Sequence, residues 1–221
     1  MTTTALITGS ASGIGLELCK QLKARGCHVI AVCRSVSPEL RGLDVEVIDG
    51  IDLTKPNDVL RVKERIQGRT LHWLMNNAGL FENETLGAID YAQIHRQLEI
   101  NTIAPLRLTE ALATSLTQGS KIGITTSRMG SIEDNTSGGY YGYRLSKAAV
   151  NMIGKSLAVD LKPRGVAVAL LHPGYVKTKM TGFNGEITPE VSAQGLIKVM
   201  DALSLETSGG FWHTNGQRLP W

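Results

Sequence analysis

Short apolar runs alternate with longer amphipathic patterns along the whole chain, and this alternation restricts the folds that it can adopt. The apolar runs have the length and composition of strands that are buried on both faces of a sheet. They lie at residues 5–8, 28–33, 45–48, 71–75, 121–125, 166–171 and 211–213. Helical patterns lie between them at residues 13–25, 56–67, 90–117, 140–161 and 189–204. Because strands that alternate with helices form right-handed crossovers, we expect an α/β, doubly wound fold: a mostly parallel, seven-stranded sheet with helices on both faces.

Length and composition suit one folded unit. The chain has 221 residues, of which 42% are hydrophobic and 19% are charged, and no stretch rich in proline, serine and glycine separates two halves. We therefore expect a single domain, residues 1–221. Its ligand would lie beyond the carboxyl ends of the strands, as it does in open α/β sheets.

Charge and cysteine content argue against several classes of protein. The net charge is only +3, and lysines and arginines are scattered among acids, so nucleic acid is not an expected partner. No apolar run reaches the ~18 residues of a membrane span, and the first residues lack the basic segment of a secretory signal. The three cysteines form no C-x-x-C motif and the five histidines show no ligand spacing. These features predict a cytoplasmic protein without a membrane anchor or a metal site.

Glycines in the spacing G-x-x-x-G-x-G follow the first predicted strand. Glycine permits a tight turn and lets backbone N–H groups approach a phosphate, and the helix that follows offers unpaired donors at its N-terminus. This position favours a site for the pyrophosphate of a dinucleotide. The alternative is a strand–helix turn that needs glycine for its backbone alone. The residues expected to contact the dinucleotide here are Gly9, Ser10, Ser12, Gly13, Ile14 and Gly15.

The end of the second predicted strand distinguishes NAD from NADP. An acid there, about 20 residues past the glycine motif, would bind the ribose hydroxyls of NAD and repel the 2′-phosphate of NADP. This strand ends in Cys33, Arg34 and Ser35, and no acid occurs before Glu39. A guanidinium group binds a phosphate through two donors at once. Arg34 therefore predicts that NADPH is preferred over NADH; the alternative is that Arg34 is a solvated surface residue.

Tyr143 and Lys147 are four residues apart in a helical pattern, so their side chains share one face. An ammonium group favours the phenolate form of a nearby tyrosine and would lower its pKa. Ser127 follows the fifth predicted strand, and Asn101 lies in the long helical pattern before it. All four side chains can reach the same crevice. For the tyrosine and the lysine alone, a packed phenol beside a solvated ammonium group is the simpler alternative.

Taken in order, these motifs resemble the classical short-chain dehydrogenase/reductase family over nearly the whole chain. The motifs are Thr8-Gly9-x-x-x-Gly13-Ile14-Gly15, Asn76-Asn77-Ala78-Gly79, Asn101, Ser127, Tyr143-x-x-x-Lys147 and His172-Pro173-Gly174. The segments 127–132, 138–144 and 219–221 are similar to those of the small C-factor-like and sniffer-like carbonyl reductases. The resemblance implies a Rossmann-like fold and an NADPH-dependent reductase of aldehydes and ketones, which works in reverse as an alcohol dehydrogenase.

The resemblance also implies a role for each of the four polar residues. Tyr143 would donate a proton to the carbonyl oxygen, or accept one from an alcohol. Lys147 would lower the pKa of Tyr143 and bind the nicotinamide ribose, while Ser127 would hold the substrate oxygen. Asn101 would position a water molecule that links Lys147 to solvent.

Further cofactor contacts follow from the same resemblance. The residues are Asp52 and Leu53 near the adenine, Asn77, Ala78 and Gly79 on the floor of the cleft, and Pro173, Gly174, Val176 and Thr178 near the nicotinamide. For Asp52, a role as a turn acid is an equal alternative. The segment from Pro173 to Pro189, where the family carries its substrate lid, is short, so we expect an open and shallow cleft.

Two other functions are compatible with such a fold. A signalling protein could bind the dinucleotide and act through partners, although it would not need a tyrosine and a serine in these positions. An epimerase or dehydratase of the extended branch would have a larger C-terminal part and a different glycine spacing. Members of the family are often homodimers or homotetramers. The residues leave the oligomeric state and the identity of the small carbonyl or alcohol substrate open.

Overall fold

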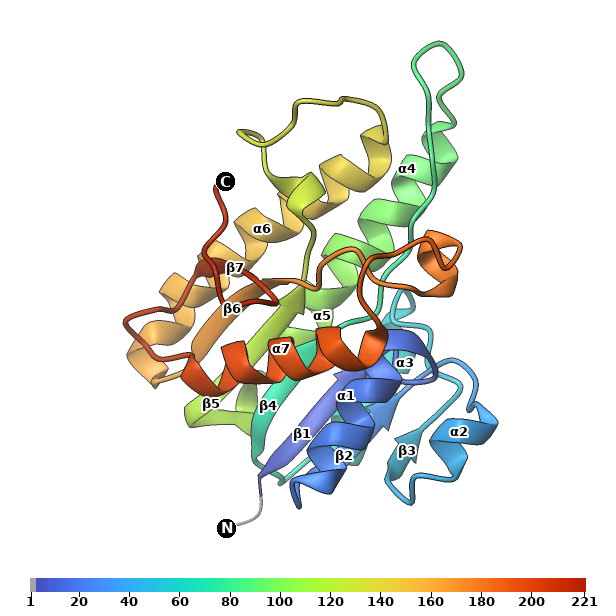
Figure 1. Ribbon diagram of the computed structural model, residues 1–221. Coiled ribbons are helices and arrows are strands. Elements are labelled where there is room, and N and C mark those ends of the chain that lie inside the picture. The colour runs from blue at the N-terminus through green and yellow to red at the C-terminus, as the bar shows by residue number, and fades with distance from the viewer. Residues whose placement is uncertain (1–2) are drawn as a thin grey trace.

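Seven strands form one sheet at the centre of the computed structural model, which describes residues 3–221 (Figure 1). The strands are β1 (Thr4–Thr8), β2 (His28–Val32), β3 (Glu46–Ile48), β4 (Leu71–Asn76), β5 (Leu116–Thr125), β6 (Ala167–His172) and β7 (Gly210–His213). Their order across the sheet is β3-β2-β1-β4-β5-β6-β7, and every neighbouring pair is parallel. The predicted α/β, doubly wound fold is confirmed.

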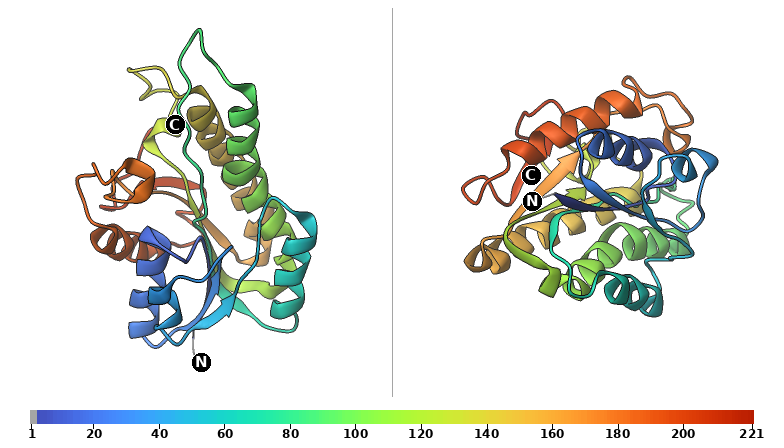
Figure 2. Two further views of the ribbon diagram at one scale, coloured as in Figure 1. Left: turned by 90° about the vertical axis from the view of Figure 1, so that its right-hand side faces the viewer. Right: turned by 90° about the horizontal axis from the view of Figure 1, so that it is seen from below.

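Helices cover both faces of this sheet (Figure 2). They are α1 (Gly13–Ala24), α2 (Pro38–Arg41), α3 (Pro56–Ile66), α4 (Tyr91–Leu98), α5 (Ala104–Ala111), α6 (Tyr141–Leu161) and α7 (Pro189–Ala202). Buried side chains form one cluster on each face; Leu6 of β1 belongs to one and its neighbour Ile7 to the other. Because successive side chains of a strand point to opposite faces, a strand covered on both sides is apolar throughout. Within residues 3–221, no helix is both long enough and apolar enough to cross a membrane.

The predicted helix at residues 90–117 is wrong as a single element. Helix α4 continues into a π-helical segment, Glu99–Ile103, and α5 ends at Ala111. Strand β5 begins at Leu116, where it pairs with Leu71, rather than at the predicted residue 121. Polar residues and a glycine at positions 117–120 separate this first pairing from the apolar run, so the pattern concealed it.

Helix α2 was not predicted, because four residues are too few to show a helical period. The residues at its N-terminus stabilise it: the hydroxyl of Ser37 accepts a hydrogen bond from the N–H group of Leu40 at 3.2 Å, and Pro38 occupies the first turn. The boundaries of the other predicted elements agree with the structure to within two residues.

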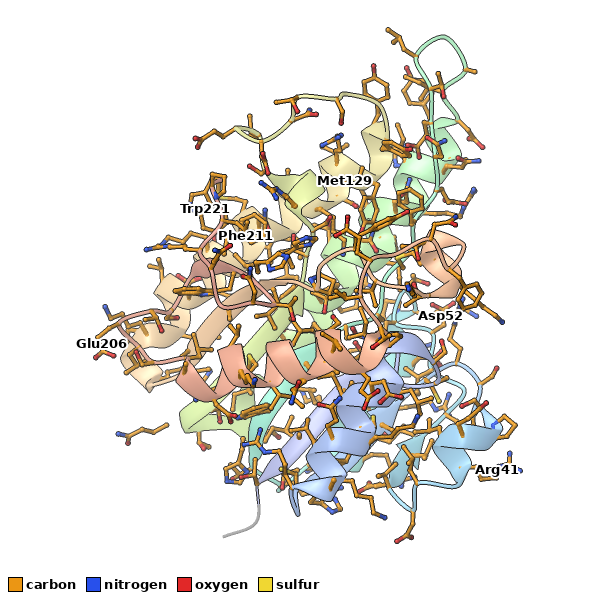
Figure 3. The ribbon with its side chains drawn as sticks, in the orientation of Figure 1. Arg41, Asp52, Met129, Glu206, Phe211 and Trp221 are labelled. Carbon is orange, nitrogen blue, oxygen red and sulfur yellow. The ribbon has the colours of Figure 1, made fainter. Side chains whose placement is uncertain are left out.

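The strand order reverses its direction between β1 and β4. The chain first adds β2 and β3 on one side of β1. It then crosses to the other side of β1, where it adds β4, β5, β6 and β7. A crevice opens outside the carboxyl ends of the strands at such a reversal. The loops after β1, β4, β5 and β6 all reach this edge of the sheet, and Met129, in the loop after β5, is labelled there in Figure 3.

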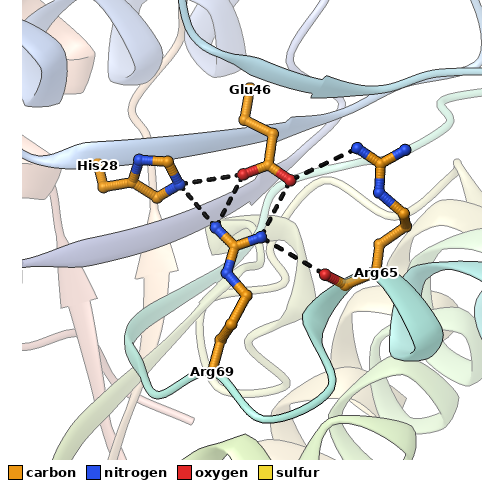
Figure 4. Close-up of polar contacts among 4 residues, drawn as sticks. All are labelled: His28, Glu46, Arg65 and Arg69. Carbon is orange, nitrogen blue, oxygen red and sulfur yellow. Dashed lines mark hydrogen bonds and ion pairs between the residues drawn. The ribbon is translucent and has the colours of Figure 1, made fainter.

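A cluster of charged side chains holds the opposite end of β2 and β3 (Figure 4). The carboxylate of Glu46 accepts hydrogen bonds from the two terminal nitrogens of Arg69, at 3.0 and 2.8 Å. It also lies 3.0 Å from Nε2 of His28 and 3.7 Å from Arg65. Hydrogen bonds from Arg69, together with the charges of Arg69 and His28, hold the pKa of Glu46 below its usual value. The cluster thereby joins two strands to the segment after α3.

Removal of this carboxylate gives a pH-dependent stability test. Because the folded protein lowers the pKa of Glu46, the stabilisation is present above the ordinary carboxyl pKa and is lost as the pH falls through the lowered value. We predict that Glu46→Gln reduces the free energy of unfolding by about 1 kcal/mol at pH 7. The difference should shrink as the pH falls through the lowered pKa and vanish once Glu46 is protonated in the folded protein. Urea unfolding at neutral and at acidic pH measures it, with the exposed Glu64→Gln as the control. A difference that does not change with pH would contradict this account.

Candidate active site

The ends of β1 and β4 are tied together at the centre of the crevice. The hydroxyl of Thr8 accepts hydrogen bonds from the N–H groups of Asn77, at 2.9 Å, and Ala78, at 3.0 Å. Gly9 has a φ of +65°, and a Cβ there would lie 2.9 Å from Cα of Ala78. At Gly15 a side chain would collide with the carbonyl group of Gly9. Close packing of these segments therefore accounts for part of the glycine motif.

The N-terminus of α1 faces the same crevice. Ser12 precedes the helix, is exposed and makes no capping hydrogen bond through its side chain, and the first turn contains no acid. Gly13 follows with a φ of +55°, and a Cβ there would lie 3.3 Å from the methyl group of Thr178, in the loop after β6. Ser10 is buried, and its hydroxyl donates to the carbonyl of Val32 at 3.0 Å. This helix end can hold an anion, with Ser12 free to donate and Ser10 already engaged.

The loops after β2 and β3 form the outer end of the crevice. Arg34 is exposed. Asp52 accepts hydrogen bonds from the N–H group of Thr54, at 3.1 Å, and from its hydroxyl, at 2.8 Å, so it does act as a turn acid. Leu53 is buried in the core, and Arg107 donates to its carbonyl at 3.2 Å. The loop that carries Asp52 and Leu53 is thereby fastened to α5.

The loop after β6 is short and firmly held. The carbonyl of Pro173 accepts a hydrogen bond from the hydroxyl of Ser192 at 2.7 Å. Gly174 has a φ of +83°, and a Cβ there would lie 2.9 Å from the side chain of Ile187. Val176 is buried and pairs with Ile187 in an isolated parallel bridge. These contacts fix the wall of the crevice on this side.

Ser127, Tyr143 and Lys147 come together where β5 ends beside α6, and all three are buried. Nζ of Lys147 lies 5.6 Å from the ring centre of Tyr143 and donates to the carbonyl of Thr125 at 2.9 Å. The hydroxyl of Ser127 accepts a hydrogen bond from the N–H group of Met129 at 3.1 Å. Helical spacing brings the lysine and the tyrosine onto one face, as predicted, and the end of β5 supplies the serine.

Gly130 lets the loop after β5 lie directly on α6. A Cβ at this position would be 2.6 Å from the backbone carbonyl carbon of Lys147. The side-chain amide of Asn151 donates to the carbonyl of Gly130 at 3.2 Å. The hydroxyl of Thr126 donates to the carbonyl of Lys147 at 3.3 Å. The loop is therefore held against the helix that carries the tyrosine.

Trp221 holds the other side of this loop. Its ring stacks on Phe211 of β7, with 5.5 Å between the ring centres, and Figure 3 shows the two side by side. Its carbonyl oxygen accepts hydrogen bonds from the N–H groups of Ile132, at 2.7 Å, and Glu133, at 3.0 Å. The hydroxyl of Ser131 donates to the same oxygen at 2.9 Å. A segment remote in sequence thus fixes the approach to Ser127.

Asn101 lies in the π-helical segment between α4 and α5, and its side chain is buried. Its amide oxygen accepts from the N–H group of Leu80 at 2.7 Å, and its amide nitrogen donates to the carbonyl of Leu80 at 2.8 Å and to Ser146 at 3.0 Å. The side chain therefore ties the segment after Gly79 to α6. The positioning of a water molecule near Lys147 stays a prediction; π-helical segments do occur often at functional sites.

Burial controls the ionisation of the tyrosine and the lysine. It raises the pKa of Tyr143 to about 12, against an opposing interaction with Ser127, and it lowers the pKa of Lys147 to about 7. The lowering of the pKa of Tyr143 by Lys147 stays a prediction, since burial is the largest influence on that pKa here. Desolvation disfavours both charged forms, and the ammonium group of Lys147 is directed to a carbonyl oxygen. At neutral pH, Tyr143 is therefore a protonated donor.

Comparison with known proteins gives the family of this chain. The family described as short chain dehydrogenase matches residues 3–187. The chain belongs to this family. It is accordingly an oxidoreductase, and the resemblance inferred from its motifs is confirmed. Within residues 3–221 of this short-chain dehydrogenase, no group of three or more histidine, cysteine, aspartate or glutamate side chains could hold a metal ion.

Two relatives with known names match nearly all or two thirds of this short-chain dehydrogenase. The 1-hydroxy-2-glutathionyl-2-methyl-3-butene dehydrogenase of Rhodococcus sp. (strain AD45) is 45% identical over 224 residues, which cover 99% of each chain. The C-signal of Myxococcus xanthus is 44% identical over 151 residues, or 67% of this chain and 91% of C-signal.

Solved structures agree with the carbonyl reductase branch of the resemblance. The NADPH-bound carbonyl reductase from chicken fatty liver has a TM-score of 0.89 and 29% identity, and the match covers 100% of this chain and 99% of that one. The carbonyl reductase Sniffer of D. melanogaster has a TM-score of 0.91 and 29% identity, with both chains fully covered.

Some contacts of this short-chain dehydrogenase site had no signal in the sequence. The ring of Phe81 meets the ring of Tyr143 edge-on, with 4.9 Å between the centres. Phe81 belongs to no motif, and only the path of the chain after β4 brings it there. Ser146 bonds to Asn101 and donates to the carbonyl of Tyr143 at 2.8 Å. Its place beside Lys147 in the sequence was the one available hint.

Proposed function

We propose that this chain is an NADPH-dependent reductase of aldehydes and ketones that also oxidises the corresponding alcohols. The observation that carries the proposal is the burial of Ser127, Tyr143 and Lys147 together, beside the crevice at the carboxyl ends of the strands. A protein that only binds a dinucleotide needs the crevice but has no use for a buried proton donor. The printed names of the relatives, a dehydrogenase and carbonyl reductases, support the same reaction type.

The residues present fit a dinucleotide that lies across the crevice. The N-terminus of α1 has no acid in its first turn, and Ser12 beside it is exposed and makes no capping hydrogen bond through its side chain. Arg34 is available at the outer end for a 2′-phosphate. The residues that we propose to hold the cofactor are Gly9, Ser10, Ser12, Gly13, Ile14, Gly15, Arg34, Asp52, Leu53, Asn77, Ala78, Gly79, Tyr143, Lys147, Pro173, Gly174, Val176 and Thr178. For Ser10 this contact is through its backbone, because its hydroxyl donates to Val32.

NADPH, when bound, supplies the hydride. Tyr143 donates its phenolic proton to the carbonyl oxygen as negative charge develops there, and a pKa of about 12 keeps this proton in place at neutral pH. Ser127 holds the same oxygen through a hydrogen bond from its hydroxyl group and keeps its own proton. Lys147 then stabilises the phenolate and returns a proton to it by the route that we propose beside Asn101. In the oxidation direction, Tyr143 accepts the proton of the alcohol.

The proposed substrate is a small carbonyl compound or alcohol with little selection by size. The loop between β6 and α7 contains a single short helical turn, Lys179–Thr181, and forms no large lid. The name of the Rhodococcus relative describes an alcohol that carries a glutathionyl group. A substrate panel should therefore include hydroxy thioethers in the oxidation direction, beside simple aldehydes and ketones in the reduction direction.

The proposed setting is the cytoplasm, and the proposed assembly is a homodimer or homotetramer as in the family. Cys19, Cys27 and Cys33 are free thiols, which suits a reducing compartment. The resemblance alone supports the assembly.

The similarity to C-signal favours a second candidate function, a dinucleotide-binding signalling protein with little turnover. The two candidates differ in one measurable property. A signalling protein would bind NADPH without oxidising it in the presence of any carbonyl compound of the panel, whereas the reductase would consume it.

The proton donor gives the most direct mutational test. Tyr143→Phe removes the phenolic proton and keeps the ring, so we predict a fall in kcat of roughly 10²–10⁴-fold with NADPH affinity largely unchanged. Stopped-flow or steady-state NADPH oxidation measures the turnover, and fluorescence titration measures the affinity. Tyr141→Phe, at an exposed position two residues earlier, is the matched control and should keep wild-type turnover. Near wild-type kcat for Tyr143→Phe would refute the assignment.

The choice of cofactor gives a second test. A hydrogen bond to a charged group contributes roughly 1.5–3 kcal/mol, which corresponds to a preference for NADPH over NADH of about ten- to a hundredfold. We predict that Arg34→Ala removes most of this preference and leaves the use of NADH unchanged. Arg41→Ala, an exposed arginine on α2, is the matched control and should keep the preference (Figure 3). Equal dissociation constants of the unmutated protein for the two cofactors would contradict the role of Arg34.

A further inference from the structure

Helix α6, which carries Tyr143 in its first turn, begins without a cap of its own. The residue before it, Tyr140, has a φ of 52° and makes no capping hydrogen bond through its side chain. The first N–H groups of a helix have no partner within the helix, and buried donors of this kind need an acceptor from elsewhere. The start of α6 therefore depends on another segment.

That segment is the chain between β4 and α4, which rises beside the first turn of α6 (Figure 1). One carboxylate oxygen of Glu84 accepts a hydrogen bond from the N–H group of Gly142 at 3.0 Å. The carbonyl oxygen of Glu84 accepts a second from the N–H group of Tyr140 at 3.3 Å. The side chain of Glu84 is only 2% exposed. A carboxylate at this position also meets the positive end of the helix dipole.

The contact between Glu84 and the helix requires glycine at position 142. A Cβ on Gly142 would lie 2.7 Å from the other carboxylate oxygen of Glu84 and 2.6 Å from the amide nitrogen of Gln97. The carboxylate therefore packs directly on the backbone of the first helical turn, one residue before Tyr143.

Gln97 of α4 fixes the carboxylate from the other side. It is fully buried and its amide nitrogen donates to Glu84, while its amide oxygen accepts from the N–H group of Glu82 at 3.0 Å. These two contacts determine which way the amide group faces. The carboxylate of Glu84 thus accepts from two donors, Gln97 and Gly142.

The same segment contacts the proton donor itself. The ring of Phe81 lies 4.9 Å from that of Tyr143 and 5.5 Å from that of Tyr140, measured between ring centres. Leu80, next to it, is held by Asn101 through two hydrogen bonds. Residues 80–84 therefore link α4, the π-helical segment and the start of α6.

We propose that Glu84 is a positioning residue for the proton transfer: its carboxylate, held by Gln97, fixes the first turn of α6 and thereby the phenolic hydroxyl of Tyr143 relative to Ser127. The inference rests on the proposed function, in which Tyr143 is the proton donor. Glu84 does not touch the substrate or the reacting atoms. Its position matters because small displacements of a catalytic group slow the reaction: a shift of about 1 Å can lower the rate roughly a hundredfold.

Exchange of the two side-chain types provides the test. Glu84→Gln turns an amide donor toward the donor of Gln97, and Gln97→Glu sets two carboxylates against each other. The double variant Glu84→Gln/Gln97→Glu restores one donor and one acceptor. We expect each single variant to lose roughly ten- to a hundredfold in kcat for carbonyl reduction, with KM for NADPH little changed. We expect the double variant to recover most of the kcat, and the solvent deuterium isotope effect on kcat to rise in the single variants only.

Glu82→Gln is the matched control, since Glu82 lies on the same segment and pairs with Arg96 at 2.9 Å instead of with α6. It should keep wild-type kcat. If Glu84→Gln does not fold, Gly142→Ala replaces it in the test. The added methyl group displaces the carboxylate of Glu84, so we expect the same loss of kcat. This loss is expected although alanine favours helix formation more than glycine does.

Three outcomes would overturn the proposal while leaving the proposed function intact. They are a folded Glu84→Gln protein with wild-type kcat, a loss of thermal stability without a loss of kcat at 25 °C, and a double variant that stays as slow as the single ones. Tyr143→Phe, assayed in the same series, separates the two claims. If that variant keeps its activity, the proposed function itself fails.

Discussion

The carboxyl ends of parallel strands must meet at one edge of a sheet, and every part of the site depends on this constraint. The turn after β1, the segment after β4, and the loops after β5 and β6 come from positions spread over most of the chain. Parallel pairing in the order β3-β2-β1-β4-β5-β6-β7 brings them together. The reversal of strand order between β1 and β4 lies at this edge, where open α/β sheets bind their ligands.

Close approach of backbones, more than side-chain chemistry, fixes the site within this frame. Gly9, Gly15 and Gly130 each occupy a position where a Cβ would meet the backbone of another segment. The hydroxyl of Thr8 accepts hydrogen bonds from two backbone N–H groups that follow β4. The result is a rigid site that buries Tyr143 and Lys147 and pushes their pKa values in opposite directions, to about 12 and about 7. Both groups are thus biased toward their neutral forms before any ligand binds.

Much of this architecture was predictable from the sequence, because buried parallel strands are apolar on both faces and stand out as short runs. The helical spacing of Tyr143 and Lys147 correctly indicated a shared face. The errors of the sequence-based prediction were local. The polar residues at 117–120 concealed the start of β5, and the π-helical segment at Glu99–Ile103 has no periodic signature. The contacts of Glu84 and Phe81 could not be foreseen, since they arise from a loop that has neither a motif nor a period.

The central claim is direct hydride transfer at a site where Tyr143 supplies the proton. It is tested most directly with NADPH that carries deuterium at the transferable position of the nicotinamide, incubated with the unmutated protein and a reactive ketone. The account predicts that mass spectrometry finds one deuterium on the carbinol carbon of the product alcohol. Alcohol without deuterium, or labelled cofactor that binds but is never consumed by any carbonyl compound of the panel, would contradict it.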